Sequence, residues 1–153
     1  MKLEPDSSLI KEMRIEAEKS PCKIIKFSAS DGICNFSYNG EYYADCEDCK
    51  RTEIEQPYPN CKASHAEWGA IRKMIKVPKR NSSIYIYCKA SDGTDYPFTR
   101  FWCKTCAVLL PMFGIKNVYM WDGNMWVYRD SSKLISEVER NIEHITLNEN
   151  SLD

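Results

Sequence analysis

The sequence predicts one α/β domain over residues 1–153, built as a three-layer α/β/α sandwich around a mixed five-stranded central sheet. Three observations support this fold class. Helical and strand patterns alternate along the chain, five short segments are rich in β-forming residues, and an apolar content of 43% suits a globular core. The expected order is helix, strand pair, helix, strand, helix, strand pair, helix.

The first helix is expected over residues 6–19, because an N-cap sequence opens it and Pro21 follows it. Its apolar residues recur at helical spacing: Leu9, Ile10, Met13 and Ala17. Residues 23–28 and 33–38 then have strand composition and are joined across Asp31-Gly32, a dipeptide typical of hairpins.

The next helix is expected over residues 64–76, after a polar, cysteine-containing insert at about 40–62. Its expected apolar face comprises Trp68, Ile71 and Ile75. A strand over residues 83–87 leads, through a loop, to a helix over residues 103–114. That helix ends at Gly114, which suits a left-handed C-cap.

The last two strands are expected over residues 117–121 and 125–128. They are joined by the turn Asp122-Gly123-Asn124, which favours an antiparallel hairpin. Asp130 or Ser131 then caps a final helix. Its expected apolar side comprises Leu134, Ile135, Val138 and Ile142.

Composition narrows the possible functions. The formal net charge of −1 and the absence of a basic stripe argue against an electrostatic nucleic-acid binder. The sequence has no run of about 18 apolar residues that would predict a membrane span, and its N-terminal residues lack an apolar signal core. Both observations favour a cytoplasmic protein.

In a reducing compartment, the eight cysteines are more readily explained as metal ligands or catalytic groups than as disulfides. Cys34 and Cys88 fall within strand patterns and are expected to be buried.

A possible metal site links two of the expected helices. Cys103 and Cys106 are three residues apart at the start of one helix, and His65 stands at the start of another. The positive ends of two helices would stabilise thiolates, and three protein ligands leave the fourth position of a tetrahedral zinc ion open to water. Glu67 could then take a proton from that water. Taken singly, a His-x-Glu is more often a solvated helix face, and a Cys-x-x-Cys can be redox-active or simply buried. Their joint occurrence favours the metal site.

The motifs His65-Ala66-Glu67 and Cys103-Lys104-Thr105-Cys106 resemble the signature of the zinc-dependent cytidine and deoxycytidylate deaminase family, H-x-E followed by P-C-x-x-C. The resemblance implies hydrolytic removal of an exocyclic amine by a zinc-bound hydroxide, with Glu67 as the proton shuttle. It also implies that the backbone N–H of Ala66 contacts the base. Trp102 replaces the proline before the first cysteine, so it would alter the shape of the pocket and contact the substrate there.

Within the family the chain looks most like the deoxycytidylate deaminases, on the stretches that surround Cys22, Tyr38-Asn39-Gly40 and Cys61. The likeness implies that Asn39 bonds the sugar of the nucleotide; the alternative is an Asn-Gly that merely turns the chain. It also implies a homo-oligomer. A second, structural Zn²⁺ could be held by four cysteines: Cys22, Cys46, Cys49 and Cys61. Alternatively, Cys22 or Cys34 packs in the core while Cys46 and Cys49 stay free.

The leading hypothesis is therefore deamination of a cytosine nucleotide, dCMP to dUMP. Two features depart from that branch: the long connection over residues 88–100, which would place aromatic side chains near the pocket, and the final strand hairpin, where the branch has a helix. A deaminase of bases in tRNA or single-stranded DNA, or of a free nucleoside or base, is the first alternative; the low net charge disfavours nucleic acid. A non-catalytic zinc-binding module is the second, and the presence of Glu67 argues against it.

Overall fold

A mixed five-stranded sheet with the strand order β2-β1-β3-β4-β5 forms the middle layer of the protein. Strands β3 and β4 are parallel, and all other neighbouring pairs are antiparallel. The strand bounds are β1 Ile25–Ser30, β2 Phe36–Tyr38, β3 Ser83–Ala90, β4 Asn117–Trp121 and β5 Trp126–Asp130. The predicted fold class is confirmed, and so is the antiparallel pairing of the last two strands.

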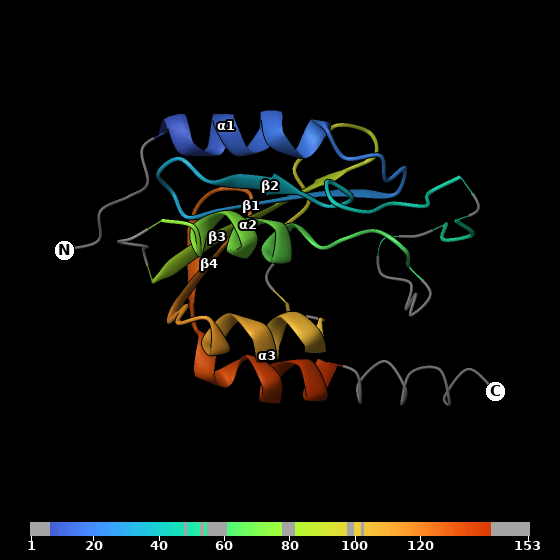
Figure 1. Ribbon diagram of the computed structural model, residues 1–153. Helices are drawn as coiled ribbons and strands as arrows, with labels where there is room; N and C mark the ends of the chain where they lie inside the picture. The colour runs from blue at the N-terminus through green and yellow to red at the C-terminus, as the bar shows by residue number, and fades with distance from the viewer. Residues whose placement is uncertain are drawn as a thin grey trace.

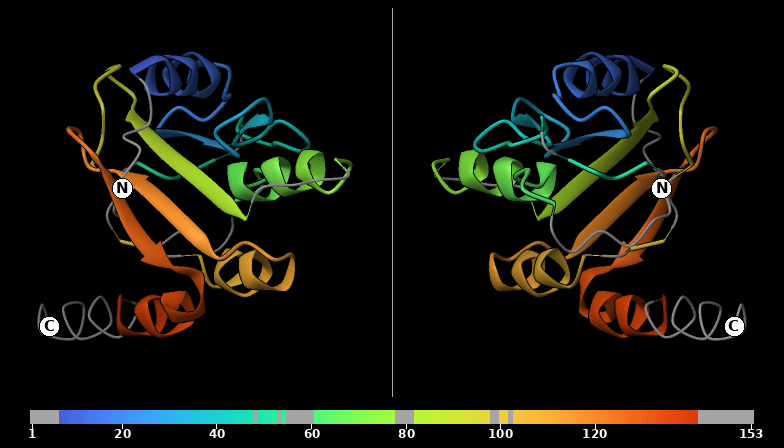
Figure 2. Two further views of the ribbon diagram at one scale, coloured as in Figure 1. Left: turned by 90° about the vertical axis from the view of Figure 1, so that its left-hand side faces the viewer. Right: turned by 90° about the vertical axis from the view of Figure 1, so that its right-hand side faces the viewer.

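Helices cover both faces of this sheet. In the computed structural model, α1 (Ser7–Glu18) lies on one side, at the top of Figure 1, and α3 (Lys104–Met112) lies with the C-terminal helix at the bottom. The helix α2 (Ala66–Met74) shares the α3 side, as the two turned views of Figure 2 show. The short 3-10 helix η1 (Ser131–Lys133) leads into the C-terminal helix, residues 134–141. The structure describes residues 7–47, 49–52, 54, 61–77, 82–97, 100–101 and 103–141.

The alternation of side chains along the strands divides the core in two. Ile84 and Ile86 of β3 face α2 and α3, together with Val118 and Met120 of β4. Tyr87 points to the opposite side and packs against α1. The apolar residues predicted for the first helix, Leu9, Ile10, Met13 and Ala17, are all buried in this second cluster. No helix in the described part of the chain is long and apolar enough to cross a bilayer.

The connection between β1 and β2 is longer than a tight hairpin turn. Asp31 Oδ1 accepts hydrogen bonds from the backbone N–H groups of Ile33, Cys34 and Asn35, at 2.9, 3.1 and 3.1 Å. These bonds hold the chain in a loop, so β2 begins only at Phe36. The prediction that Cys34 is buried is therefore wrong: the residue is exposed, whereas Cys88 on β3 is buried as expected.

Two helix faces differ from their predicted patterns. On α2 the buried side comprises Ala66, Glu67, Gly69, Ala70, Ile71 and Met74. Ile75 caps the end of this helix and is 47% exposed, so it lies off the face that packs against the sheet. In the C-terminal helix, Ile135 is 37% exposed because the helix starts after a 3-10 turn and presents Leu134 and Val138 to the core. Ile142 lies outside the described residues.

The helix α2 approaches β2 closely at Gly69. A Cβ atom at this position would overlap Ser37 Oγ and lie 2.9 Å from Ser37 Cβ. The absence of a side chain at residue 69 thus permits the close packing that seats α2, and with it His65, against the sheet.

Gly69→Ala is expected to destabilise the protein by about 2 kcal/mol. Alanine favours the helix by about 1 kcal/mol, but overpacking costs about 3 kcal/mol here, the upper end of its usual range, because the added Cβ overlaps Ser37 Oγ. Urea unfolding of the two single variants and of the double variant Gly69→Ala/Ser37→Gly measures the effect. Because Ser37→Gly removes both clashing atoms, Gly69→Ala should reduce stability much less in the Ser37→Gly protein than in the unsubstituted protein. Equal stability of Gly69→Ala and the unsubstituted protein would contradict the packing account.

A partly buried polar network attaches α1 to the face of the sheet opposite α2 and α3. Asp95, in the loop after β3, accepts two hydrogen bonds from Arg14 of α1: Nε at 3.1 Å and Nη2 at 2.6 Å. The same carboxylate accepts a hydrogen bond from Trp121 Nε1 at 3.2 Å and another from the Tyr87 hydroxyl. Three secondary-structure elements are thereby joined at one side chain.

The order of the elements places two helix N-termini at one edge of the sheet. The chain leaves α2, returns along β3, and starts α3 beyond the carboxyl end of that strand. Because β3 and β4 are parallel, the connection that contains α3 must cross over one face of the sheet. The starts of α2 and α3 therefore meet at the carboxyl end of β3, on the face lined by Ile84 and Ile86.

Candidate metal centre

His65 occupies the N-cap position of α2 with an extended backbone, φ −77° and ψ 144°. Its side chain makes no capping hydrogen bond to the helix, which leaves the imidazole available for another partner. The residue before it is held firmly: Ser64 O accepts from the N–H of Gly40 and Ser64 N–H donates to Tyr43 O, both at 2.7 Å. These bonds attach the start of α2 to the loop that follows β2.

Cys103 and Cys106 open α3. Cys103 is the N-cap residue, and its Sγ accepts a hydrogen bond from the backbone N–H of Cys106 at 3.2 Å. A cysteine sulfur thus takes the place of the serine or aspartate oxygen that usually caps a helix. Backbone N–H groups and the positive end of α3 favour negative charge at this sulfur.

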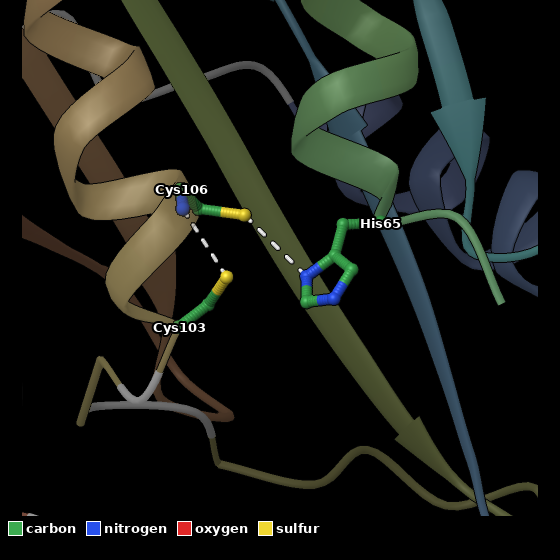
Figure 3. Close-up of side chains that lie close together, drawn as sticks. All are labelled: His65, Cys103 and Cys106. Carbon is green, nitrogen blue, oxygen red and sulfur yellow. Dashed lines mark hydrogen bonds between the residues drawn. The ribbon is translucent and has the colours of Figure 1, made fainter. Parts of the chain in front are cut away.

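The three side chains converge between the two helices (Figure 3). Cys106 Sγ lies 3.4 Å from His65 Nδ1, and the ligand atoms of His65, Cys103 and Cys106 all lie within 4.8 Å of one another. Within the described ranges this is the one group of three or more such side chains that could hold a metal ion. A tetrahedral zinc ion with its usual bond lengths separates sulfur and nitrogen ligands by about 3.5–3.8 Å, so the donor set fits zinc in chemistry and spacing.

Glu67 is buried beside this cluster, with only 7% of the residue exposed. Its Oε2 lies 3.9 Å from His65 Nδ1, the same nitrogen that faces Cys106. Burial would raise the pKa of Glu67, but the nearby polar group and charge of His65 outweigh it and hold this pKa below its usual range. The carboxyl group is therefore charged and directed at the candidate ligands.

The cluster also polarises its own members. A hydrogen bond with Cys103 and a second with Glu67 raise the pKa of His65 to about 11, although half of this side chain is exposed. The hydrogen bond with Cys106 lowers the pKa of Cys103 to about 5, while Cys103 and burial raise the pKa of Cys106. One proton is thus shared unequally by the two thiols. Without a metal, the negative Cys103 sulfur and Glu67 carboxylate surround one protonated imidazole, and a cation could take the place of that proton.

The other predicted contact residues have distinct places. Ala66 is fully buried at the first turn of α2, and Trp102 lies outside the described residues. The Asn39 side chain bonds to the backbone of β1: its Oδ1 accepts from Phe27 N–H at 2.8 Å and its Nδ2 donates to Ile25 O at 3.2 Å. The N–H of the neighbouring Gly40 donates to Ser64 O, so Asn39 is one residue away from a bond that anchors the start of α2.

Two residues near the site could not be found from the sequence patterns. Glu137 and Asn141, both on the C-terminal helix, bond the backbone of Phe101, two residues before Cys103. The contacts join side chains to a backbone 36 and 40 residues away, and neither residue belongs to a recognisable motif.

No family model and no curated protein matches the sequence. Among solved structures, the chain is similar to the dCMP deaminase from the cyanophage S-TIM5, solved in the apo form, with 19% sequence identity and a TM-score of 0.47. The alignment covers 90% of this chain and 94% of the phage protein. This likeness is too distant to assign an activity, and the case for a function rests on how His65, Cys103, Cys106 and Glu67 are arranged.

Proposed function

We propose that the protein is a zinc-dependent hydrolytic deaminase of a cytosine nucleotide, with dCMP as the leading substrate and dUMP as the product. One observation carries the proposal. Three side chains suited to zinc converge from two helix N-termini, and a buried carboxylate lies 3.9 Å from the imidazole nitrogen of that cluster. A purely structural site needs a fourth strong ligand and has no use for a buried glutamate beside it.

His65, Cys103 and Cys106 are the residues that would hold the ion. Zinc bound by three protein ligands acidifies a water molecule and so provides a nucleophile at neutral pH. Such a nucleophile would add to the amine-bearing carbon of the base, and the carbon–nitrogen bond would break as ammonia leaves and a carbonyl forms.

Glu67 is proposed to move the protons. Its carboxylate lies beside the candidate ligands, where it could accept a proton from the attacking water. The same carboxylate would return that proton to the ring nitrogen. It would then carry the proton of the added hydroxyl group to the departing amine. Because Glu67 is only 7% exposed, bulk water would have little access to compete for these protons.

Three residues are proposed to orient the substrate: Asn39 through the sugar, Ala66 through its backbone N–H, and Trp102 through the wall of the pocket. For Asn39 the proposal requires a further bond beyond the two that it makes to β1. This is feasible because an amide offers two donors and two acceptor sites.

Ammonia release from the zinc-loaded protein tests the proposed activity. The panel comprises dCMP, CMP, deoxycytidine, cytidine, cytosine, the matching adenine and guanine compounds, and a single-stranded oligonucleotide. The expected result is fastest release from dCMP with stoichiometric dUMP. Ammonia release from the oligonucleotide alone would make nucleic acid the substrate instead of dCMP. Release from the free nucleoside alone would make that nucleoside the substrate. Full zinc occupancy with no ammonia from any compound would favour a non-catalytic module.

A second zinc site, built from Cys22, Cys46, Cys49 and Cys61, is also proposed. Burial raises the pKa of Cys46, and so do the charges of Cys22, Cys61 and Cys49. Among the described residues these four sulfurs do not form a group as tight as the His65 cluster, so the proposal requires the ion to draw the cysteine-containing insert together. The N–H of Cys49 donates to Cys46 O at 3.3 Å, which closes a turn between them. The N–H of Ile25 donates to Cys22 Sγ at 3.5 Å. A cation would relieve the mutual repulsion of these sulfurs.

The zinc content should therefore be two ions per chain, measured by mass spectrometry of the metal-loaded protein. Cys46→Ser is expected to lower it to one, because the structural site loses a ligand while the centre at His65 is untouched. Cys34→Ser is the matched control, since Cys34 is exposed in the loop between β1 and β2 and should leave both ions in place. One ion in the unsubstituted protein would contradict the second site.

A further inference from the structure

Two side chains of the C-terminal helix hydrogen-bond to the backbone of Phe101, two residues before Cys103. Glu137 Oε1 accepts a hydrogen bond from the backbone N–H of Phe101 at 3.2 Å, and Asn141 Nδ2 donates to the backbone O of the same residue at 2.9 Å. Glu137 and Asn141 are four residues apart on the helix and therefore share one face. The N–H and the C=O of a single residue are thus both held by side chains of one distant element.

Burial of Phe101 and an ion pair of Glu137 stabilise these two hydrogen bonds. The Phe101 residue is only 1% exposed and packs in the core between the sheet and the helices, so its backbone groups could not easily turn to water instead. The Glu137 side chain is 16% exposed, and its second oxygen, Oε2, lies 3.4 Å from Arg129 Nε on β5. The ion pair fixes the carboxylate while its other oxygen receives the N–H of Phe101.

These two bonds restrain the chain directly before the candidate metal ligand Cys103. Cys103 follows Phe101 by two residues and must hold an extended conformation, φ −86° and ψ 106°, to bring its sulfur to His65 and Cys106. Residue 102 is tryptophan, whose φ angle is not restricted by a ring as that of a proline would be. Local sequence therefore does little to fix the approach to Cys103, and the restraint comes from the C-terminal helix.

We propose that Glu137 and Asn141 are positioning residues for the metal ligand Cys103. By fixing both polar groups of Phe101, they restrict the conformations open to the chain before α3 and hold Cys103 where it can bind together with His65 and Cys106. The inference rests on the proposed zinc centre but adds residues to it that touch neither metal nor substrate. Outer partners of this kind typically contribute 10- to 100-fold to metal affinity or activity.

Zinc affinity, measured by competition with a chromogenic chelator, tests the inference. Glu137→Ala and Asn141→Ala are each expected to weaken zinc binding at the His65 centre by about 10-fold or more. Glu137→Gln keeps an acceptor for the N–H of Phe101 and should remain within about 3-fold of the unsubstituted protein. Glu139→Ala is the matched control: it makes the same change on the same helix at an exposed position and should not alter the affinity.

A second measurement needs no metal. Hydrogen exchange of the metal-free protein, followed in the peptide that contains Phe101 and Cys103, should be faster in Glu137→Ala and Asn141→Ala but unchanged in Glu139→Ala. If Glu137→Ala does not fold, Asn141→Ala alone carries the test, because it removes one bond at a half-buried position.

The outcomes separate this inference from the proposed function. Unchanged zinc affinity and exchange in both alanine variants would overturn the positioning role while leaving the zinc centre intact. Weakened zinc binding without any deaminase activity would support the positioning role and defeat the proposed reaction. A protein that binds no zinc through His65, Cys103 and Cys106 would overturn both.

Discussion

Glu67→Gln is expected to lower the turnover of the zinc-loaded protein by about 10²–10⁴-fold, the usual contribution of a general acid–base residue. Glutamine preserves the size and shape of the buried side chain, so α2 should keep its packing. It can neither accept a proton from water nor return one to the base. Because Glu67 is not one of the three side chains grouped as ligands, the zinc content should stay the same.

Parallel assays of ammonia release and zinc content check this prediction. Glu139→Gln, at an exposed position on the C-terminal helix, serves as the matched control and should retain full activity. A thermal unfolding curve for each variant distinguishes loss of chemistry from loss of fold. Turnover close to that of the unsubstituted protein would rule out Glu67 as the proton carrier, whereas loss of zinc in Glu67→Gln would make it a ligand instead.

The second large effect concerns stability. Asp95→Ala is expected to reduce the free energy of unfolding by about 3 kcal/mol, because it removes hydrogen bonds to a charged group and strands their donors. Arg14 loses both of its bonds to this carboxylate, and the buried Tyr87 hydroxyl loses its acceptor. Trp121 loses the partner of its indole N–H. The Asp95 side chain is only 22% exposed, so water replaces these contacts incompletely.

The pH dependence of the same network has a definite sign. The hydrogen bond from Arg14 is the main cause that holds the pKa of Asp95 below its ordinary value, against the opposing effect of burial. A depressed pKa in the folded state means that the stabilisation is fully present above the unfolded pKa of about 3.9 and is lost as the pH falls below it. The stability difference between the unsubstituted protein and Asp95→Asn should therefore be largest above pH 5 and shrink in stronger acid.

Urea unfolding at several pH values measures both effects. Asp95→Asn retains an acceptor oxygen and should lose less stability than Asp95→Ala. Asp92→Ala is a suitable control, because Asp92 is an exposed aspartate of the same loop whose carboxylate bonds only locally, to Thr94. A pH-independent difference between the unsubstituted protein and Asp95→Asn would show that the charge of Asp95 contributes nothing to the fold.

The parts of the molecule that could be predicted are those governed by local periodicity. The apolar spacing of Leu9, Ile10, Met13 and Ala17 located a helix and its buried face, and Asp122-Gly123-Asn124 located the final hairpin. The approach of His65 to Cys103 and Cys106 could be predicted as well, because each residue opens a helix and the order of elements brings those openings to one edge.

What could not be predicted depends on contacts between distant segments. Asp31 holds the loop after β1 through backbone bonds that shorten β2, which strand propensity does not reveal. Ile75 and Ile135 are apolar but lie just off the packed faces of their helices, because a single-residue shift in where a helix begins or ends turns them toward solvent. The bonds of Glu137 and Asn141 to Phe101 join segments that only the assembled sheet brings together.

The separation of the candidate metal ligands along the chain would have a kinetic consequence if they bind an ion. Cys106 and His65 are 41 residues apart, and all of β3 lies between them, so they meet only after the crossover between parallel strands has formed. Closing such a long loop is entropically costly and is usually completed late in folding. A bound ion therefore cannot act as an early nucleus for the chain. It would stabilise a fold that has already formed, and so it should lower the unfolding rate far more than it raises the folding rate.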